Sequence, residues 1–169
     1  MSGFEPSIVF HGLWPVAKRL PRWAIRRHFS AQRLAELVYV DLYTRNQSAV
    51  VNLGPSASFN LHLQAINLSP FEIELDRAEF HFRCAGIDLS AAILKKQSIA
   101  SGGVASLFVG EAVGEGQANQ IASLREMNQS TLEGNIEFNC RIRSFPKVLL
   151  QLSGVQVSFL NAHLRGGVT

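Results

Sequence analysis

The sequence predicts an all-β fold, a seven-stranded antiparallel β-sandwich of immunoglobulin-like architecture. The main observation is that apolar and polar residues alternate with a period of two from residue 37 to residue 160, which is typical of strands with one buried and one solvated face. Clusters of glycine, proline and serine interrupt this alternation at spacings typical of sandwich turns. With 169 residues, of which 47% are hydrophobic, the chain can bury a substantial core.

The segment before the sandwich, residues 1–36, is helical in pattern and basic in charge. Residues 6–35 contain six cations and no carboxylate. A proline in the first turn predicts a helix over residues 21–29, and Ser30 is the expected N-cap of a second helix over residues 31–37. The two helices share an apolar stripe that is formed by Leu20, Trp23, Ala24, Ala31, Leu34 and Ala35.

The period-two pattern places the strands in order along the sandwich domain, residues 37–160. A phase shift divides the third strand, and one short helix is expected between the fifth and sixth strands, with Ile121, Ala122 and Leu124 facing inward. A C-terminal tail, residues 161–169, follows the domain. The expected strands are residues 38–43, 59–65, 71–84, 87–95, 104–113, 132–142 and 148–160.

Several short motifs in this domain have a recognisable order. The second predicted strand ends at Asn67 and is followed at once by Ser69-Pro70-Phe71, and a glycine hairpin comes next at Gly86. A glycine turn at Gly102 precedes an apolar strand, and the sixth strand begins with Leu132-Glu133-Gly134. This order resembles the LEA type 2 domain, also called the water-stress and hypersensitive-response (WHy) domain. The family's compact Asn-Pro-aromatic turn is longer here.

The resemblance implies a fibronectin-III-like sandwich that is usually non-enzymatic and is often placed beside a membrane anchor. It also connects the chain with stress protection, membrane-proximal scaffolding and lipid handling. No segment of the sequence is predicted to span a membrane, and the N-terminus does not resemble a signal peptide. The compartment therefore stays open, and a membrane-associated or extracytoplasmic location would follow if an anchor preceded Met1.

No catalytic, cofactor-binding or metal-binding constellation is predicted. Cys84 and Cys140 both fall on the apolar faces of their strands, so they either form a disulfide between the sheets or are two buried free thiols. The free thiols are favoured because two cysteines make no disulfide framework. His81 cannot share a metal ion with Cys84, because residues three apart on a strand point to opposite faces.

The feature of the sequence that says most about function is the basic N-terminal segment. Its cations and aromatic residues could contact an anionic membrane surface or a partner protein. Alternatively, the helices cap one end of the sandwich and their arginines face water. Nucleic acid is disfavoured as a partner because the sandwich offers no accompanying basic and aromatic platform. The candidate contact residues are Trp14, Lys18, Arg19, Arg22, Trp23, Arg26, Arg27, Phe29 and Arg33.

The leading hypothesis is a non-catalytic LEA-2-like module that binds or scaffolds at a membrane surface, without a cofactor. A second hypothesis is a lipid or apolar-ligand carrier, and a third is a structural subunit that forms a homo-oligomer through its edge strands. For the carrier, the ligand would lie between the sheets and contact Phe59, Phe71, Phe80, Phe82 and Phe138.

Overall fold

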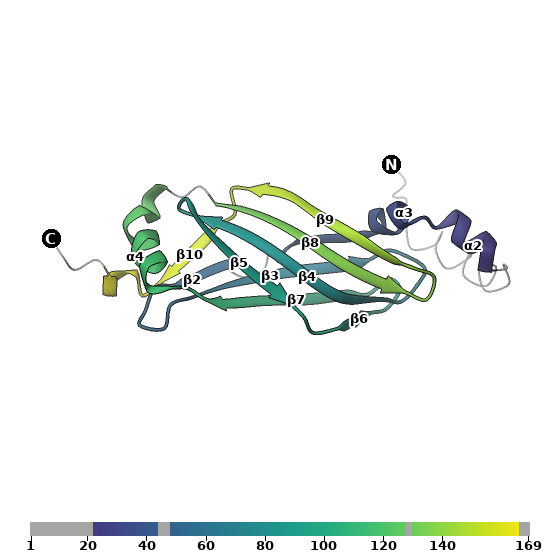
Figure 1. The fold of residues 1–169 in the computed structure, drawn as a ribbon, viewed down its shortest axis with the longest axis horizontal. Helices are drawn as coiled ribbons and strands as arrows, with labels where there is room; N and C mark the ends of the chain where they lie inside the picture. The colour runs from purple at the N-terminus through teal and green to yellow at the C-terminus, as the bar shows by residue number, and fades with distance from the viewer. Residues whose placement is uncertain (1–21, 44–47, 128–129, 166–169) are drawn as a thin grey trace, which may run out of the picture.

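The computed structural model describes residues 22–43, 48–127 and 130–165, which form a long sandwich of two sheets with short helices at both ends (Figure 1). The helices at one end are α2 (Arg22–His28) and α3 (Ala31–Glu36). At the other end lie α4 (Glu115–Leu124) and two single 3-10 turns, η1 (Arg125–Met127) and η2 (Ala162–Arg165). The described residues are therefore mostly β, as the sequence predicts.

The first sheet, sheet A, is organised around its longest strand, β3. One edge of β3 pairs antiparallel with β7, and the other edge pairs antiparallel first with β2 and then with β1. Strand β10 extends this sheet by pairing parallel with β2. The members of sheet A are β1 (Val38–Leu42), β2 (Ala49–Asn52), β3 (Ser58–Asn67), β7 (Val104–Ala112) and β10 (Val157–Leu160).

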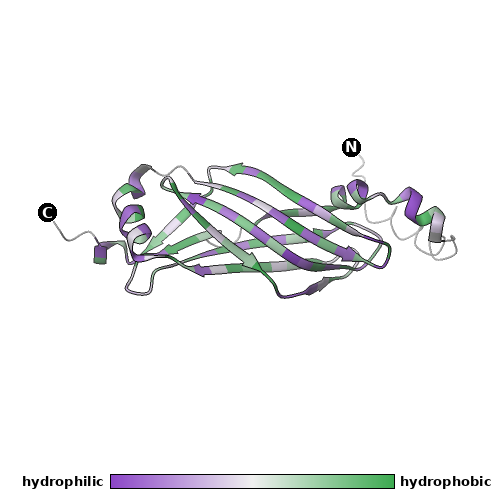
Figure 2. Ribbon diagram, viewed as in Figure 1, coloured by the Kyte–Doolittle hydropathy of each residue, from purple (hydrophilic) through white to green (hydrophobic). Residues whose placement is uncertain are grey.

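The second sheet, sheet B, is antiparallel in the order β5-β4-β8-β9, and β6 pairs with the beginning of β4. Hydrophobic and hydrophilic residues alternate along the strands of both sheets (Figure 2). The members of sheet B are β4 (Ile73–Cys84), β5 (Ile87–Ile93), β6 (Gln97–Ile99), β8 (Thr131–Cys140) and β9 (Ser144–Ser153).

The predicted number of seven strands is too small, because the described residues contain ten. Strands β2 and β6 are four and three residues long, which is too short for a clear alternation. The predicted strand over residues 148–160 is in fact split between β9 and β10. Strand β9 also begins at Ser144, before the expected start at residue 148, and includes Pro146. Among the described strands β9 has β8 as its one neighbour, so the missing N–H of Pro146 can face the open edge.

The predicted phase shift in β4 is confirmed and has a physical cause. The register between β4 and β8 shifts between Leu75 and Arg77, so one extra residue is accommodated in the ladder. Ile73 and Leu75 are buried before the shift, and Ala78 begins the buried series after it. Without the shift, the apolar residues after it, Ala78, Phe80, Phe82 and Cys84, would face water.

The core fills the space between the two sheets. Phe59 on sheet A stacks on Phe82 of sheet B with ring centroids 6.0 Å apart. Ile121 and Ala118 of α4 are fully buried and close the sandwich at the α4 end. Of the three residues predicted to face inward on this helix, Ile121 is buried, while Ala122 and Leu124 are half-buried against the core.

The N-terminal helices begin and end close to the predicted positions. The Ser30 side chain accepts a hydrogen bond of 3.2 Å from the backbone N–H of Arg33, as an N-cap should. Leu34 is fully buried, and the ring of Phe29 meets Phe71 edge to face at a centroid distance of 5.0 Å. The predicted apolar stripe is wrong in one place, because Trp23 is 69% exposed.

Candidate functional site at the helical end

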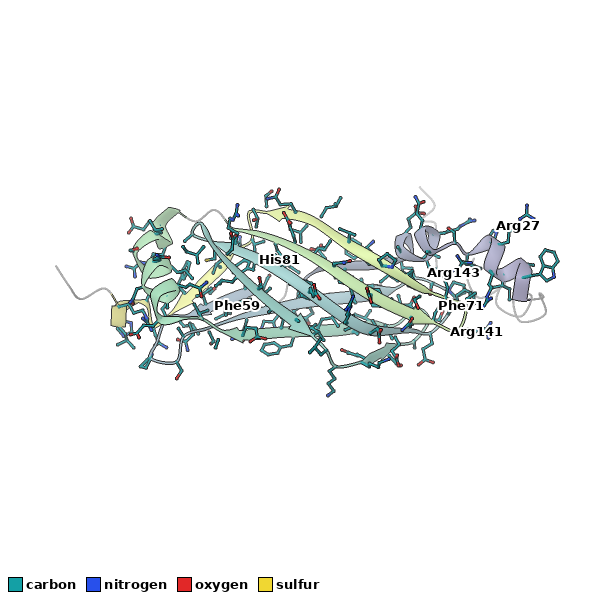
Figure 3. All side chains as sticks on the ribbon, in the orientation of Figure 1. Arg27, Phe59, Phe71, His81, Arg141 and Arg143 are labelled. Atoms are coloured by element: carbon teal, nitrogen blue, oxygen red, sulfur yellow. The ribbon has the colours of Figure 1, made fainter. Side chains whose placement is uncertain are left out.

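The structure describes part of the predicted contact set. Trp14, Lys18 and Arg19 lie outside the described residues, and α2 begins at Arg22, whose side chain is not described. The remaining members lie at the end of the sandwich that carries α2 and α3, called here the helical end (Figure 3). There Trp23, Arg26, Arg27 and Arg33 are exposed and Phe29 is half-buried.

Helix α2 presents an aromatic side chain and cations on the same exposed segment. Trp23 lies near the start of the helix, while Arg26, Arg27 and His28 form its last turn. The buried contact of this helix is made by Ile25, which is 8% exposed. Arg27 points away from the sandwich in Figure 3. An exposed indole beside exposed guanidinium groups is suited to a surface that carries negative charge and has an apolar layer beneath it.

The sandwich contributes further cations to this end, and sequence analysis missed them. Arg143 donates a hydrogen bond of 2.7 Å to the carbonyl oxygen of Arg26, near the C-terminus of α2. Lys147 on β9 donates a bond of 2.9 Å to the carbonyl oxygen of Ala35, near the C-terminus of α3. Backbone carbonyls at helix C-termini carry partial negative charge, so both cations stabilise the docked helices.

Burial lowers the pKa of Lys147 from its ordinary value, while the nearby carboxylate of Glu36 acts in the opposite direction. Arg141, in the turn between β8 and β9, has its guanidinium carbon 5.3 Å from the centroid of the Phe71 ring. Its side chain is exposed, so it adds to the positive surface beside α2. The turn containing Arg141 is far from α2 in sequence, and no local pattern could have linked the two.

An open groove of about 490 Å³ lies next to this end, on sheet B. Carboxylates and one cation line it, together with apolar and neutral polar groups, so the groove has no strong preference for an anion. Its lining residues are Phe71, Glu72, Ile73, Glu74, Ser98, Asn139, Cys140 and Arg141.

The two cysteines lie at opposite ends of sheet B. Cys84 pairs with Ile87 at the end of β4, whereas Cys140 pairs with Ile73 at its beginning. Position 84 lies eleven steps along β4 from position 73, a distance of about 36 Å at 3.3 Å per step, and a disulfide needs Cα atoms within about 7 Å. The disulfide alternative is therefore wrong, and both residues are free thiols. Burial raises the pKa of Cys84 to about 11.

His81, which the sequence analysis excluded as a metal ligand with Cys84, and the ion-paired Lys96 are ordinary surface groups. His81 is exposed and its Nδ1 lies 3.1 Å from the hydroxyl of Ser90, on the face opposite to buried Cys84. Lys96 bridges Glu74 at 3.1 Å and Asp76 at 2.7 Å, and these contacts raise its pKa. Within the described ranges, no group of three or more His, Cys, Asp or Glu residues is arranged to hold a metal ion.

No family model matches this chain, and no curated protein matches it. Among solved structures, a structural genomics target is 12% identical with a TM-score of 0.48, over 73% of this chain and 89% of that one. A candidate late embryogenesis abundant (LEA) protein is 14% identical with a TM-score of 0.45, over 89% of this chain and 88% of that one. A protein from Arabidopsis thaliana is 15% identical with a TM-score of 0.43, over 73% of this chain and 81% of that one. None of these likenesses assigns a family to the chain. In the described part of the chain, no helix is long and apolar enough to cross a bilayer.

Proposed function

We propose that this protein is a non-catalytic, LEA-2-like β-sandwich that binds an anionic membrane surface through its helical end and serves there as a binding or scaffolding module. The observation that carries the proposal is the exposure of Trp23 beside Arg26 and Arg27, on a helix that projects from the sandwich.

The LEA-2 part of the proposal is supported by the turn after β3. The family-like turn is longer here, and the added length is held by side chains. Asn67 Oδ1 accepts a bond of 3.0 Å from the backbone N–H of Ser69 and another of 2.6 Å from its hydroxyl. The Asn67 amide then reaches the carbonyl of Phe71. The turn residues that carry part of the resemblance, Asn67, Ser69 and Phe71, thus form one hydrogen-bonded unit.

The membrane part is supported by charge and shape. A lysine or arginine close to an anionic membrane surface is worth about 1 kcal/mol, and the effect falls off within a Debye length of about 10 Å. Only cations that can approach the surface closely therefore count. Arg27 and Arg141 are exposed at the same end of a long molecule (Figure 3), and Arg26 and Arg33 are exposed on the two helices at that end.

The same helices also cover the end of the sandwich, through Ile25, Phe29 and Leu34. Capping and membrane contact use different sides of the helices, so the two interpretations are compatible. This changes the design of the experiment, because deletion of residues 1–36 would remove the fully buried Leu34 from the core and uncover the ring of Phe71 that Phe29 covers. Point substitutions of exposed arginines avoid that problem.

The test is co-sedimentation of the full chain with vesicles of phosphatidylcholine containing phosphatidylserine. We expect the double variant Arg26→Gln/Arg27→Gln to bind roughly tenfold or more weakly, since about 2 kcal/mol of attraction is lost. Arg83→Gln/Arg125→Gln removes the same charge from the α4 end of the sandwich and should bind like the wild type. Absence of wild-type binding, or equal weakening by both pairs, would contradict the proposal.

The carrier hypothesis gains no support from the packing. Phe59, Phe71, Phe80, Phe82 and Phe138 are each at most 2% exposed and belong to the common core. A ligand between the sheets would have to separate these side chains and give up their contacts.

A further inference from the structure

The outer faces of the two sheets differ sharply in charge. The exposed and half-buried positions of sheet B carry many ionised groups, as is usual for a solvated sheet face. At the outward positions of the described strands of sheet A there is one carboxylate, Asp41, and no lysine or arginine; Glu111, at the end of β7, is exposed but belongs to the inward-facing series of that strand. The charged residues of sheet B are Glu74, Asp76, Arg77, Glu79, Arg83, Asp88, Glu133, Glu137 and Lys147.

Aromatic and aliphatic side chains take the place of charges on sheet A. Tyr39, Ile66 and Val104 form one row across three neighbouring strands, and Tyr39 and Val104 are 53% and 57% exposed. A second row pairs His62 with Phe108, whose rings lie 5.0 Å apart and of which Phe108 is 59% exposed. Depletion of charge together with enrichment in Tyr and Phe is the composition of an interface core.

The single charge on this face is already engaged. The hydroxyl of Tyr39 donates a hydrogen bond of 2.6 Å to Asp41, and the backbone N–H of Leu42 donates another of 2.7 Å. The Asp41 carboxylate also raises the pKa of Tyr39. Covering the face would therefore bury a carboxylate that already has two donors, which lowers the cost of removing it from water.

We infer that the outer face of sheet A is a protein–protein interface and that its partner is a second copy of this chain, packed sheet against sheet about a twofold axis. Such a pairing is isologous, which means that the same surface of each copy forms the interface and must be complementary to itself. Two faces without unpaired charges meet this condition, whereas two copies of the charged face of sheet B would bury many ions.

The available area agrees with a dimer. Strand β3 has ten residues, or about 33 Å, and three to four strands about 4.8 Å apart lie side by side along it. The face therefore covers roughly 550 Å² per copy as a flat projection, or roughly 1,100 Å² for the pair. A specific interface needs about 1,000 Å², and the relief of the side chains adds to the flat value. This inference does not depend on membrane binding, because it uses the side of the sandwich and leaves the helical end free.

The test is the mass of the full chain by sedimentation velocity over a wide range of concentration. We expect the wild type to form dimers, and Phe108→Lys to raise the dimer dissociation constant at least tenfold. Ser106→Lys places the same charge between the two rows without removing a packed ring, so it should act alike and keep the fold. The control is Ala92→Lys, on the exposed face of the edge strand β5 in sheet B, which should dimerise like the wild type.

Circular dichroism should show the same folded state for all four proteins. A wild type that stays monomeric at the highest concentration would overturn the inference. So would a dimer that persists in Ser106→Lys, or one that Ala92→Lys disrupts equally. A stable complex with a different protein in place of the dimer would overturn the choice of partner.

Discussion

The side-chain amide of Asn67 donates a hydrogen bond of 2.7 Å to the carbonyl oxygen of Phe71. The same amide lies 3.0 Å from the carbonyl oxygens of Ile99 and Ala100, and its own oxygen accepts from Ser69. Asn67 is fully buried, so these contacts replace those it would make with water. One side chain thus joins the end of β3, the turn before β4 and the segment after β6.

Replacement of Asn67 by alanine should lower the free energy of unfolding by about 2–4 kcal/mol, because several buried carbonyls lose their donor at once. Urea unfolding measures this loss. The control is Asn135→Ala, at an exposed position of β8, for which we expect a change within about 0.5 kcal/mol. A similar small change for both variants would show that the network contributes little.

Gly134 and Gly116 should respond in opposite ways to alanine. A Cβ at Gly134 would lie 2.7 and 2.9 Å from two ring carbons of Phe80, which is 1% exposed and cannot move aside. We expect a loss of about 1–3 kcal/mol from overpacking. A Cβ at Gly116, within α4, meets nothing within 4 Å, so alanine should stabilise by about 0.5–1 kcal/mol. Thermal unfolding of both variants tests the pair, and destabilisation at both sites would contradict it.

Cys84 should make the stability fall at alkaline pH. Its folded-state pKa of about 11 lies above the ordinary value of 9.0, because burial disfavours the thiolate. Below pH 9 the thiol is protonated in both states and stability is unaffected. Between about pH 9 and 11 the unfolded chain loses the proton first, so the free energy of unfolding decreases as the pH rises.

The measurement is urea unfolding at several pH values for the wild type and for Cys84→Ala. The difference between the two proteins should shrink or change sign above pH 9, since the alanine variant lacks this titration. Thiol alkylation in the folded protein should also be slower at Cys84 than at the half-buried Cys140. Parallel pH curves for the two proteins would contradict the assigned cause.

The contribution of Arg165 to stability should depend on the planar, forked shape of its guanidinium group. Its Nε donates to the carbonyl of Leu53 at 2.6 Å, and its terminal nitrogens reach Asn119 at 2.6 Å and the carbonyl of Gly54 at 3.0 Å. Lysine keeps the charge but cannot reproduce this fork, so Arg165→Lys should cost about 1–2 kcal/mol in chemical unfolding. Arg77→Lys, which alters one exposed ion pair with Glu137, should cost less than about 0.5 kcal/mol.

The sequence predicted those parts of the fold that depend on local pattern. Long strands such as β3 and β8 repeat the two-residue alternation often enough to be recognised, and the phase shift in β4 was visible as a change in the apolar series at Leu75. The Ser30 cap was equally local. Strands β2 and β6 were missed because each is too short to show a pattern, and each is a strand because it pairs with a longer one, β3 or β4.

The candidate site was predicted in part for the same reason. The arginines of α2 and α3 form a run in sequence, so their clustering needed no tertiary information. The inward residue of α2 could not be chosen from two helical turns, and Ile25 rather than Trp23 faces the core. Tertiary contacts bring further cations to the site. Arg143 contacts Arg26 and Lys147 contacts Ala35, each across more than a hundred residues of sequence, and Arg141 lies in the same turn as Arg143.

The parallel pairing of β10 with β2 has a consequence for the order of assembly during synthesis. Strand β2 is among the first strands to leave the ribosome, and its partner β10 is the last. Until then the outer edge of β2 has no neighbour, and a newly made chain offers it to any extended segment nearby. The step that completes sheet A must therefore wait until residues 157–160 have been made, and we expect this long-range closure, rather than the local hairpins, to limit the folding rate.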